Sequence, residues 1–189
     1  MNIFASLAIL FAAGFAVPAY GQEPGTGGPK ILVAYFSKTG TTRAVAEMVH
    51  ARVGGDLFRI VPKDPYPENY TRATEVAREE LNSNARPELA ESIPPGTMSE
   101  YDVVFIGYPI WWGTMPMVVF TFLEQHDLSG KTIVPFCTHG GSGAARGPAD
   151  IAASCPDSTV GEVLAVRGGS TANAGNDVDA WLRRLGYGK

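Results

Sequence analysis

The sequence predicts an α/β fold in which a parallel sheet lies between two layers of helices. Three segments, residues 31–36, 101–108 and 132–137, are apolar almost throughout. A continuous apolar run is typical of a strand that is buried on both faces. A helical pattern follows each run, and strands that alternate with helices form parallel sheets with right-handed crossovers. We therefore expect a three-layer sandwich.

Weaker patterns supply the remaining elements. Residues 56–61 alternate between apolar and polar side chains, which suits a strand near the sheet edge. Residues 160–166 are expected to form the last strand. Pro135 cannot donate to a strand ladder, so we expect a bulge at that position. Together these segments predict a five-stranded parallel sheet in the order 2-1-3-4-5. The expected helices begin near Arg43 and cover residues 71–84, 118–125, 144–154 and 177–185.

The composition fits one ordinary domain, which we place at residues 30–189. The chain has 189 residues and a formal net charge of -4, which argues against nucleic-acid binding through bulk positive charge. Residues 1–21 carry no charged side chain, and their apolar run is short for a membrane span but suits a signal peptide. We expect cleavage after Gly21, export to the periplasm and no membrane contact afterwards. Because no Lys or Arg precedes the run, an uncleaved membrane anchor is the alternative. Residues 22–29 are expected to be a flexible linker.

A turn rich in hydroxyl groups connects the first predicted strand to its helix. The start of a helix presents free backbone N–H groups and the positive end of the helix dipole, so it attracts anions, most often phosphate. The alternative is that Thr41 or Thr42 only caps the helix. The candidate anion-binding residues are Ser37, Lys38, Thr39, Gly40, Thr41 and Thr42.

Two adjacent tryptophans follow the second buried strand. We expect at least one indole to pack under neighbouring loops and one to present a flat stacking surface to a planar ligand. Pro109 stiffens this turn, and Gly113 allows backbone to approach a ligand. The candidate ligand-binding residues are Pro109, Ile110, Trp111, Trp112, Gly113 and Thr114.

The third buried strand ends in a Gly-rich loop. All three loops follow strands, so they lie on the carboxyl rim, where open α/β sheets bind ligands. A phosphate at one loop and a planar ring at another describe a mononucleotide. The candidate residues of the third loop are Thr138, His139, Gly140, Gly141 and Gly143.

These motifs together resemble the flavodoxins. The pattern Ser-x-Thr-Gly-x-Thr at residues 37–42 is similar to the flavodoxin phosphate loop, and residues 107–113 are similar to the aromatic loop of one flavodoxin-like branch. The likeness covers about residues 30–185 and implies a flavodoxin-like three-layer sandwich. It continues through residues 122–124, 128–131 and 138–143.

The resemblance implies that the chain binds FMN. The 37–42 turn would hold the phosphate, and Trp112 or Trp111 would stack on the isoalloxazine. Gly113 and Thr114 would present backbone near N5, and the 138–143 loop would supply backbone donors to the pyrimidine edge. That loop lacks the tyrosine with which many flavodoxins cover the second ring face. The second face is then open to a substrate or covered by Tyr66 or Tyr70, and His139 is either a donor to flavin or substrate or a solvated loop residue.

Three functions are compatible with these observations. The favoured function is an electron carrier that uses the isoalloxazine of FMN, with a redox partner protein or a small-molecule electron acceptor. The second is an FMN oxidoreductase that reduces quinones or similar acceptors with NAD(P)H. The third is a flavin-free module that binds proteins through the same rim. We expect no metal site.

Two other features give weaker signals. Cys137 and Cys155 are expected to be separate thiols, because the intervening helix spans about 15 Å and a disulfide needs Cα atoms within about 7 Å. Residues 140–144 differ at one position from the motif Gly-x-Ser-x-Gly, which holds the nucleophile of many hydrolases. All three histidines precede that serine, whereas the hydrolase fold needs its histidine afterwards.

Overall fold

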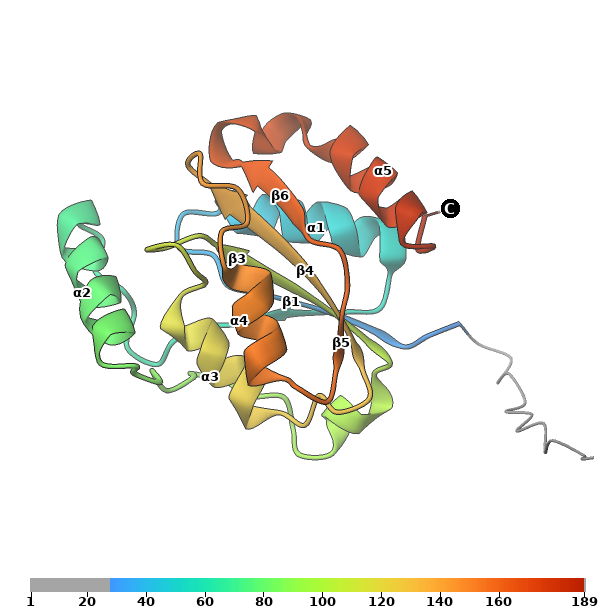
Figure 1. Cartoon of the computed structure of the whole chain (residues 1–189), viewed down its shortest axis with the longest axis horizontal. Coiled ribbons are helices and arrows are strands. Elements are labelled where there is room, and N and C mark those ends of the chain that lie inside the picture. The colour runs from blue at the N-terminus through green and yellow to red at the C-terminus, as the bar shows by residue number, and fades with distance from the viewer. Residues whose placement is uncertain (1–27, 189) are drawn as a thin grey trace, which may run out of the picture.

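The computed structural model describes residues 28–188 and has a parallel sheet as its middle layer (Figure 1). Its strands are β1 (Ile31–Tyr35), β2 (Asp56–Arg59), β3 (Val103–Pro109), β4 (Thr132–His139), β5 (Thr159–Val160) and β6 (Leu164–Arg167). The order β2-β1-β3-β4-β5, with β6 also paired to β4, confirms the predicted sheet. The expected signal peptide lies outside the described residues.

The expected single strand over residues 160–166 is wrong. The fifth position of the sheet holds two short strands, β5 beside the start of β4 and β6 beside its end. Residues 161–163 interrupt the pairing between them. The physical reason lies in β4, where Pro135 has no backbone N–H to offer a neighbour.

The expected bulge at Pro135 is absent from the pairing of β4 with β3, whereas on the other side of β4 the three residues 161–163 lie opposite the two residues 134–135. The register between β3 and β4 runs residue for residue, with Ile106 opposite Pro135. On the other side of β4, the carbonyl of Ile133 accepts a hydrogen bond from Gly161 at 2.8 Å. Residues two apart present their backbone groups to the same side of a strand. The missing N–H of Pro135 therefore faces the interruption between β5 and β6, where no ladder bond is lost.

Two layers of helices cover the sheet. Helices α1 (Thr41–Val53) and α5 (Gly175–Arg184) lie on one face, and α3 (Met117–Gln125) and α4 (Gly147–Ser154) lie on the other (Figure 1). Helix α2 (Tyr70–Asn82) lies at one side of the molecule, where its Val76 packs against the core on the side of α3 (Figure 1). Two 3₁₀ turns complete the fold, at Thr97–Glu100 and Gly168–Asn173.

Helix α4 begins three residues later than expected. Ala145 has a φ of 47°, in the left-handed region, so residues 144–146 cannot belong to an α-helix. Pro148 follows in the first turn of α4, where its missing N–H costs nothing.

The two faces of β1 enter separate cores. Ile31, Val33 and Tyr35 pack with α1 and α5 around the fully buried Trp181. Leu32 and Ala34 pack on the opposite side. This alternation is the period of two expected of a strand buried on both faces. In the part of the chain that the structure describes, no helix is long and apolar enough to cross a membrane. Within the same residues, His, Cys, Asp and Glu side chains form no group that could hold a metal ion.

Candidate ligand-binding site at the carboxyl rim of the sheet

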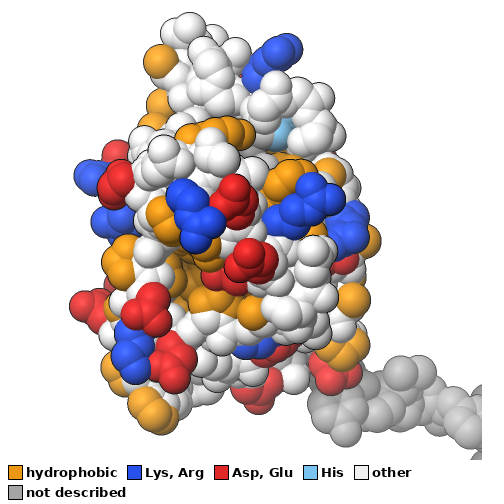
Figure 2. Space-filling model, turned by 90° about the vertical axis from the view of Figure 1, so that its left-hand side faces the viewer, with side chains coloured by type: hydrophobic (Ala, Val, Ile, Leu, Met, Phe, Trp, Pro, Cys, Tyr) orange, Lys and Arg blue, Asp and Glu red, His pale blue; other side chains and the backbone are white. Residues whose placement is uncertain are grey.

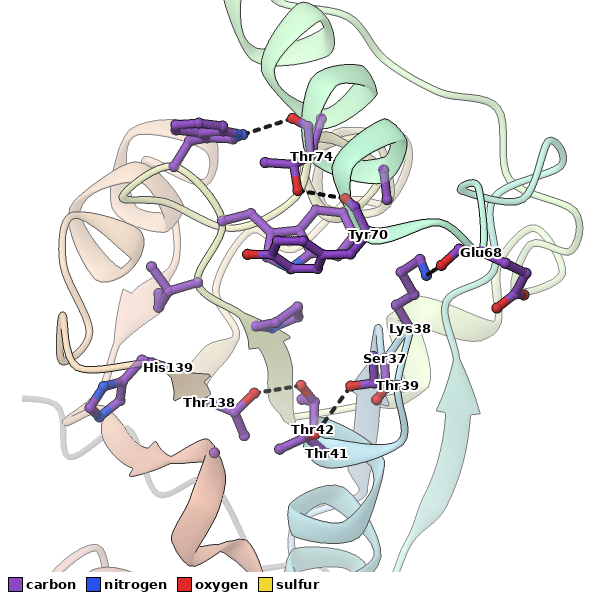
Figure 3. Close-up of a pocket in the computed structure, with 18 residues that line it drawn as sticks. Ser37, Lys38, Thr39, Thr41, Thr42, Glu68, Tyr70, Thr74, Thr138 and His139 are labelled. Carbon is purple, nitrogen blue, oxygen red and sulfur yellow. Dashed lines mark hydrogen bonds between the residues drawn. The ribbon is translucent and has the colours of Figure 1, made fainter.

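A cavity of about 530 Å³ lies where the loops after β1, β3 and β4 meet (Figure 3). Its volume falls within the range of about 300–1,000 Å³ that is typical of small-molecule sites. Twelve of the seventeen predicted site residues line it: Ser37, Lys38, Thr39, Thr41, Thr42, Pro109, Ile110, Trp111, Trp112, Thr138, His139 and Gly140. The sheet register brings these loops together, because β1, β3 and β4 are adjacent and parallel.

The other five predicted residues shape the loops instead of lining the cavity. They are Gly40, Gly113, Thr114, Gly141 and Gly143. The four glycines have φ values between 65° and 153°, in the region that side chains of L-residues rarely adopt. Tyr70, considered above for the second ring face, also lines the cavity. The residues that line it without a signal in the sequence are Glu68, Ala73, Thr74, Ala77 and Gly168.

The turn after β1 leaves polar groups free at the start of α1. Gly40, with a φ of 88°, precedes the helix, and no side chain caps it. Thr42 does not cap α1, because its hydroxyl oxygen lies 2.8 Å from that of Thr138. The hydroxyl of Thr41 lies 3.1 Å from that of Thr39. The capping interpretation is therefore wrong, and the first N–H groups of the helix have no side-chain acceptor among the described residues.

Ser37 contributes a buried hydroxyl without a partner. The residue is 5% exposed, and its Oγ makes no hydrogen bond with the described residues. A buried polar atom of this kind is rare, because leaving it unpaired costs about 1–3 kcal/mol. Free N–H groups and an unpaired hydroxyl at one helix start are the groups that a phosphate would bind.

The turn after β3 has an unusual backbone. Trp111 and Thr114 exchange two backbone hydrogen bonds of 2.8 and 3.1 Å, and the φ values of Trp112 and Gly113 are 52° and 82°. Two positive φ values define a type I′ turn, which normally carries Gly, Asn or Asp at both positions. A tryptophan in this conformation must be held by its surroundings.

Helix α4 supplies part of that support. The backbone N–H of Arg146 donates to the carbonyl of Gly113 at 3.2 Å. The Thr114 hydroxyl donates to the carboxylate of Asp150, which also accepts from the guanidinium of Arg146 at 2.9 Å. The turn is thus fixed from the side of α4.

The two tryptophans have different surroundings. Trp111 packs edge-on against Phe36 and Tyr66, with ring centroids 5.5 and 4.9 Å apart. The expectation that one indole packs under neighbouring loops is confirmed for Trp111. Trp112 is 43% exposed, its indole N–H donates to the carbonyl of Thr74 at 3.1 Å, and the guanidinium of Arg78 lies 4.5 Å from its ring centroid.

The two tyrosines considered for the second ring face also differ. Tyr66 is buried, and its hydroxyl donates to Glu80 at 2.7 Å. Burial raises the pKa of Glu80, and this hydrogen bond offsets part of the increase. Tyr70 is 83% exposed and lies at the cavity (Figure 3). Of the two, only Tyr70 is available to a ligand.

The loop after β4 orients a histidine at the cavity. The Nδ1 atom of His139 accepts a hydrogen bond from the N–H of Gly143 at 3.1 Å. A neutral imidazole that accepts at Nδ1 carries its proton on Nε2. His139 can therefore donate through Nε2. At the opposite side of the cavity, the Lys38 ammonium lies 3.4 Å from the carbonyl of Glu68 (Figure 3).

Comparison with known proteins identifies the family. A model of the flavodoxin family matches residues 30–185, which is most of the chain. The chain belongs to the flavodoxin family. The resemblance inferred from the three loops is thereby confirmed.

Solved flavodoxin-like structures agree with this assignment. A proposed flavoprotein from Bacteroides eggerthii is 38% identical, with a TM-score of 0.74 over 84% of this chain and 99% of the other. One from Bacteroides uniformis is 32% identical, with a TM-score of 0.71 over 83% and 99%. A Lactobacillus acidophilus flavoprotein in complex with FMN is 21% identical, with a TM-score of 0.64 over 79% and 99%, and shows the shared fold.

A curated relative is more distant. It is an NAD(P)H dehydrogenase (quinone) from Acidovorax ebreus, 29% identical over 128 residues. The match covers 59% of this chain and 59% of that protein, so the chain spans about three fifths of the relative's length.

Proposed function

We propose that this flavodoxin binds FMN in the cavity and transfers electrons through the isoalloxazine. The observation that carries the proposal is the unpaired hydroxyl of Ser37, buried beside the uncapped start of α1. A phosphate supplies acceptors for both the hydroxyl and the free N–H groups, so the residues present fit the group.

The three loops would divide the contacts to FMN between them. Ser37, Thr39 and Thr41 would donate to the phosphate together with the N–H groups that open α1. Trp112 and Tyr70 expose aromatic rings at the cavity and would contact the planar ring system. His139 would donate from Nε2. When bound, FMN supplies the electron-accepting ring, and the protein's part is to hold it and exclude water.

The redox partner is proposed to be a protein or a small-molecule acceptor. On the face that carries α2, acidic and basic side chains alternate, with hydrophobic side chains visible between them (Figure 2). A mixed surface of this kind favours recognition by shape and local pairing over steering by charge of one sign.

A second candidate function is an NAD(P)H-dependent reductase of quinones or similar acceptors. It is supported by the name of the Acidovorax ebreus relative and by the size of the cavity. Rapid mixing of the anaerobic FMN-loaded protein with NADPH or NADH separates the two functions. Flavin bleaching that is complete within seconds, followed by reoxidation with a quinone, favours the reductase. The carrier requires a partner reductase before the flavin bleaches.

Export is a separate proposal, based on residues 1–21 of the sequence. Sequencing the N-terminus of the protein recovered from the periplasm tests it. A mature chain that begins at Gln22 supports export with cleavage, whereas an intact N-terminus in the membrane fraction supports the anchor.

A further inference from the structure

Helix α2 forms one wall of the cavity. Tyr70, Ala73, Thr74 and Ala77 line it from this helix. Ala73 and Ala77 are also the two buried residues of α2, so the buried side of the helix faces the cavity. The buried side chains of α2 are these two alanines, and Val76 is partly buried against the core, so a limited apolar area holds the wall in place.

The segment that carries α2 leaves and rejoins the domain through a narrow neck. The N–H of Lys63 donates to the carbonyl of Glu88, and the N–H of Ala90 donates to that of Val61, both at 2.8 Å. These bonds pair residues 61–63 with 88–90 in antiparallel fashion, with Pro62 opposite Leu89. Residues 64–87 therefore form an excursion whose ends meet at one place, and α2 lies at one side of the molecule (Figure 1). Near these ends, Tyr66 is buried in the core and Arg86 pairs with Glu124 of α3 at 2.6 Å.

Trp112 joins this excursion to the turn after β3. Its indole N–H bonds to the carbonyl of Thr74, and the guanidinium of Arg78 lies over its ring. Both partners are on α2, one turn apart. The other side of the turn is held by α4 through Gly113 and Thr114. The turn is thus held by α4 on one side, and Trp112 contacts α2 on the other side through one hydrogen bond and one cation–π contact.

We propose that α2 is a lid on the cavity and that Trp112 holds it closed. Ligands enter and leave when α2 moves away from the turn about the neck at residues 61–63 and 88–90. Trp112 is then a positioning residue, and its left-handed backbone is what aims the indole at Thr74. That the retained ligand is FMN rests on the proposed function, whereas the lid itself does not.

The test uses a thiol as a reporter of opening. The native thiols, Cys137 and Cys155, are buried, and burial raises the pKa of both, so they react slowly. In an A77C variant the new thiol lies under α2 and is labelled only when the lid opens. An E79C variant places a thiol on the exposed side of the same helix and gives the rate for a fully accessible site.

We expect the A77C thiol to react at least about tenfold more slowly than the E79C thiol in the ligand-free protein. Adding W112F, which removes the indole N–H but keeps an aromatic ring, is expected to speed A77C labelling about fivefold. Adding R78Q is expected to speed it about threefold. The matched control is R72Q, the same change on the same helix at an arginine that pairs with Glu75, and it should leave the rate unchanged.

The outcomes separate the lid from the identity of its ligand. Equal labelling of A77C and E79C, or no effect of W112F and R78Q, would overturn the lid. The FMN-loaded protein provides a second measurement, in which R78Q, at a residue outside the cavity lining, speeds flavin release on dilution and R72Q does not. If the parent protein binds no FMN, the proposed function fails, and the labelling rates still decide whether α2 is a lid.

Discussion

The hydroxyl oxygens of Thr42 and Thr138 lie 2.8 Å apart and join the start of α1 to the end of β4, 96 residues apart in sequence. Both residues are nearly fully buried, at 1% and 4% exposure. A buried hydroxyl needs a partner, so this pair links the position of the turn before α1 to that of the end of β4.

Replacing one member of this pair should destabilise the protein. We expect T138V to lower the free energy of unfolding by about 1–2 kcal/mol, because the shape is kept and the Thr42 hydroxyl is left unpaired. The double variant T42V/T138V removes both polar groups and should cost less than the sum of the single changes. Urea unfolding measures all four proteins, and strictly additive costs would contradict a direct bond between the two hydroxyls.

Removing the Ser37 hydroxyl should weaken FMN binding without lowering the stability of the folded protein. In S37A the unpaired buried oxygen is gone, so the ligand-free protein should be as stable as the parent or more stable. Its affinity for FMN should fall about tenfold or more, because a hydrogen bond to a charged phosphate is lost. Fluorescence titration with FMN and urea unfolding provide the two measurements. The control is S142A, a serine of the loop after β4 that is not part of the cavity lining. An S37A variant that loses stability but keeps its affinity would argue for a purely structural role.

Gly107 should not tolerate a side chain. A Cβ at this position would overlap the ring of Phe136 on the neighbouring strand, and both residues lie in the middle of the sheet. We expect G107A to cost about 1–3 kcal/mol of unfolding free energy, and F136L in the same chain to recover part of it. Alanine at Gly169, where nothing lies within 4 Å, is the matched control and should be close to neutral. Equal costs at the two glycines would contradict the packing described for β3 and β4.

The two cysteines should make stability fall at high pH. Burial raises the pKa of the Cys137 thiol to about 12 and, with a contribution from the Glu124 carboxylate, that of Cys155 to about 11. Between the ordinary value of 9.0 and these values, the folded state keeps protons that the unfolded state releases. Stability is therefore fully present below pH 9 and declines as the pH rises towards 11 and 12. Urea midpoints across this range test the direction in the parent and in C137A, whose decline should be shallower.

Thiol labelling tests whether Cys137 and Cys155 are free thiols or form a disulfide. Labelling at neutral pH should be slow in the folded protein and should reach two thiols per chain after unfolding without a reductant. Finding no free thiol after unfolding would show a disulfide and would contradict both the sequence prediction and the structure.

Much of the fold could be predicted because the sheet is buried. The segments that form β1, β3 and β4 are apolar at nearly every position, which is enough to predict buried strands. Parallel pairing then places the loops after these strands on one rim of the sheet. The strand after Val160 could not be predicted in detail. This segment is divided into β5 and β6 beside Pro135 of β4, which has no N–H for the neighbouring strand. The division therefore depends on how two strands lie next to each other, and the sequence of neither strand shows it.

The site could be predicted only as far as its loops. The hydroxyl groups and the glycine of residues 37–42 are visible in the sequence, and they are enough to predict a turn that binds an anion such as phosphate. The contribution of α2 could not be inferred, because the spacing of Ala73 and Ala77 marks a buried face without saying that a cavity lies against it. The different roles of Trp111 and Trp112 depend on the positive φ of Trp112, and tryptophan has no preference for that conformation.

Comparing FMN with riboflavin, which has the same ring system without the phosphate, isolates the role that we propose for residues 37–42, which is to anchor the phosphate of FMN. Titrating the ligand-free protein with each flavin, followed by flavin fluorescence, gives the two dissociation constants. We predict that FMN binds at least about a hundredfold more tightly, and that changing Thr39 and Thr41 to isoleucine abolishes most of this difference while the chain stays folded. Equal affinities for FMN and riboflavin, or no binding of either, would contradict the account.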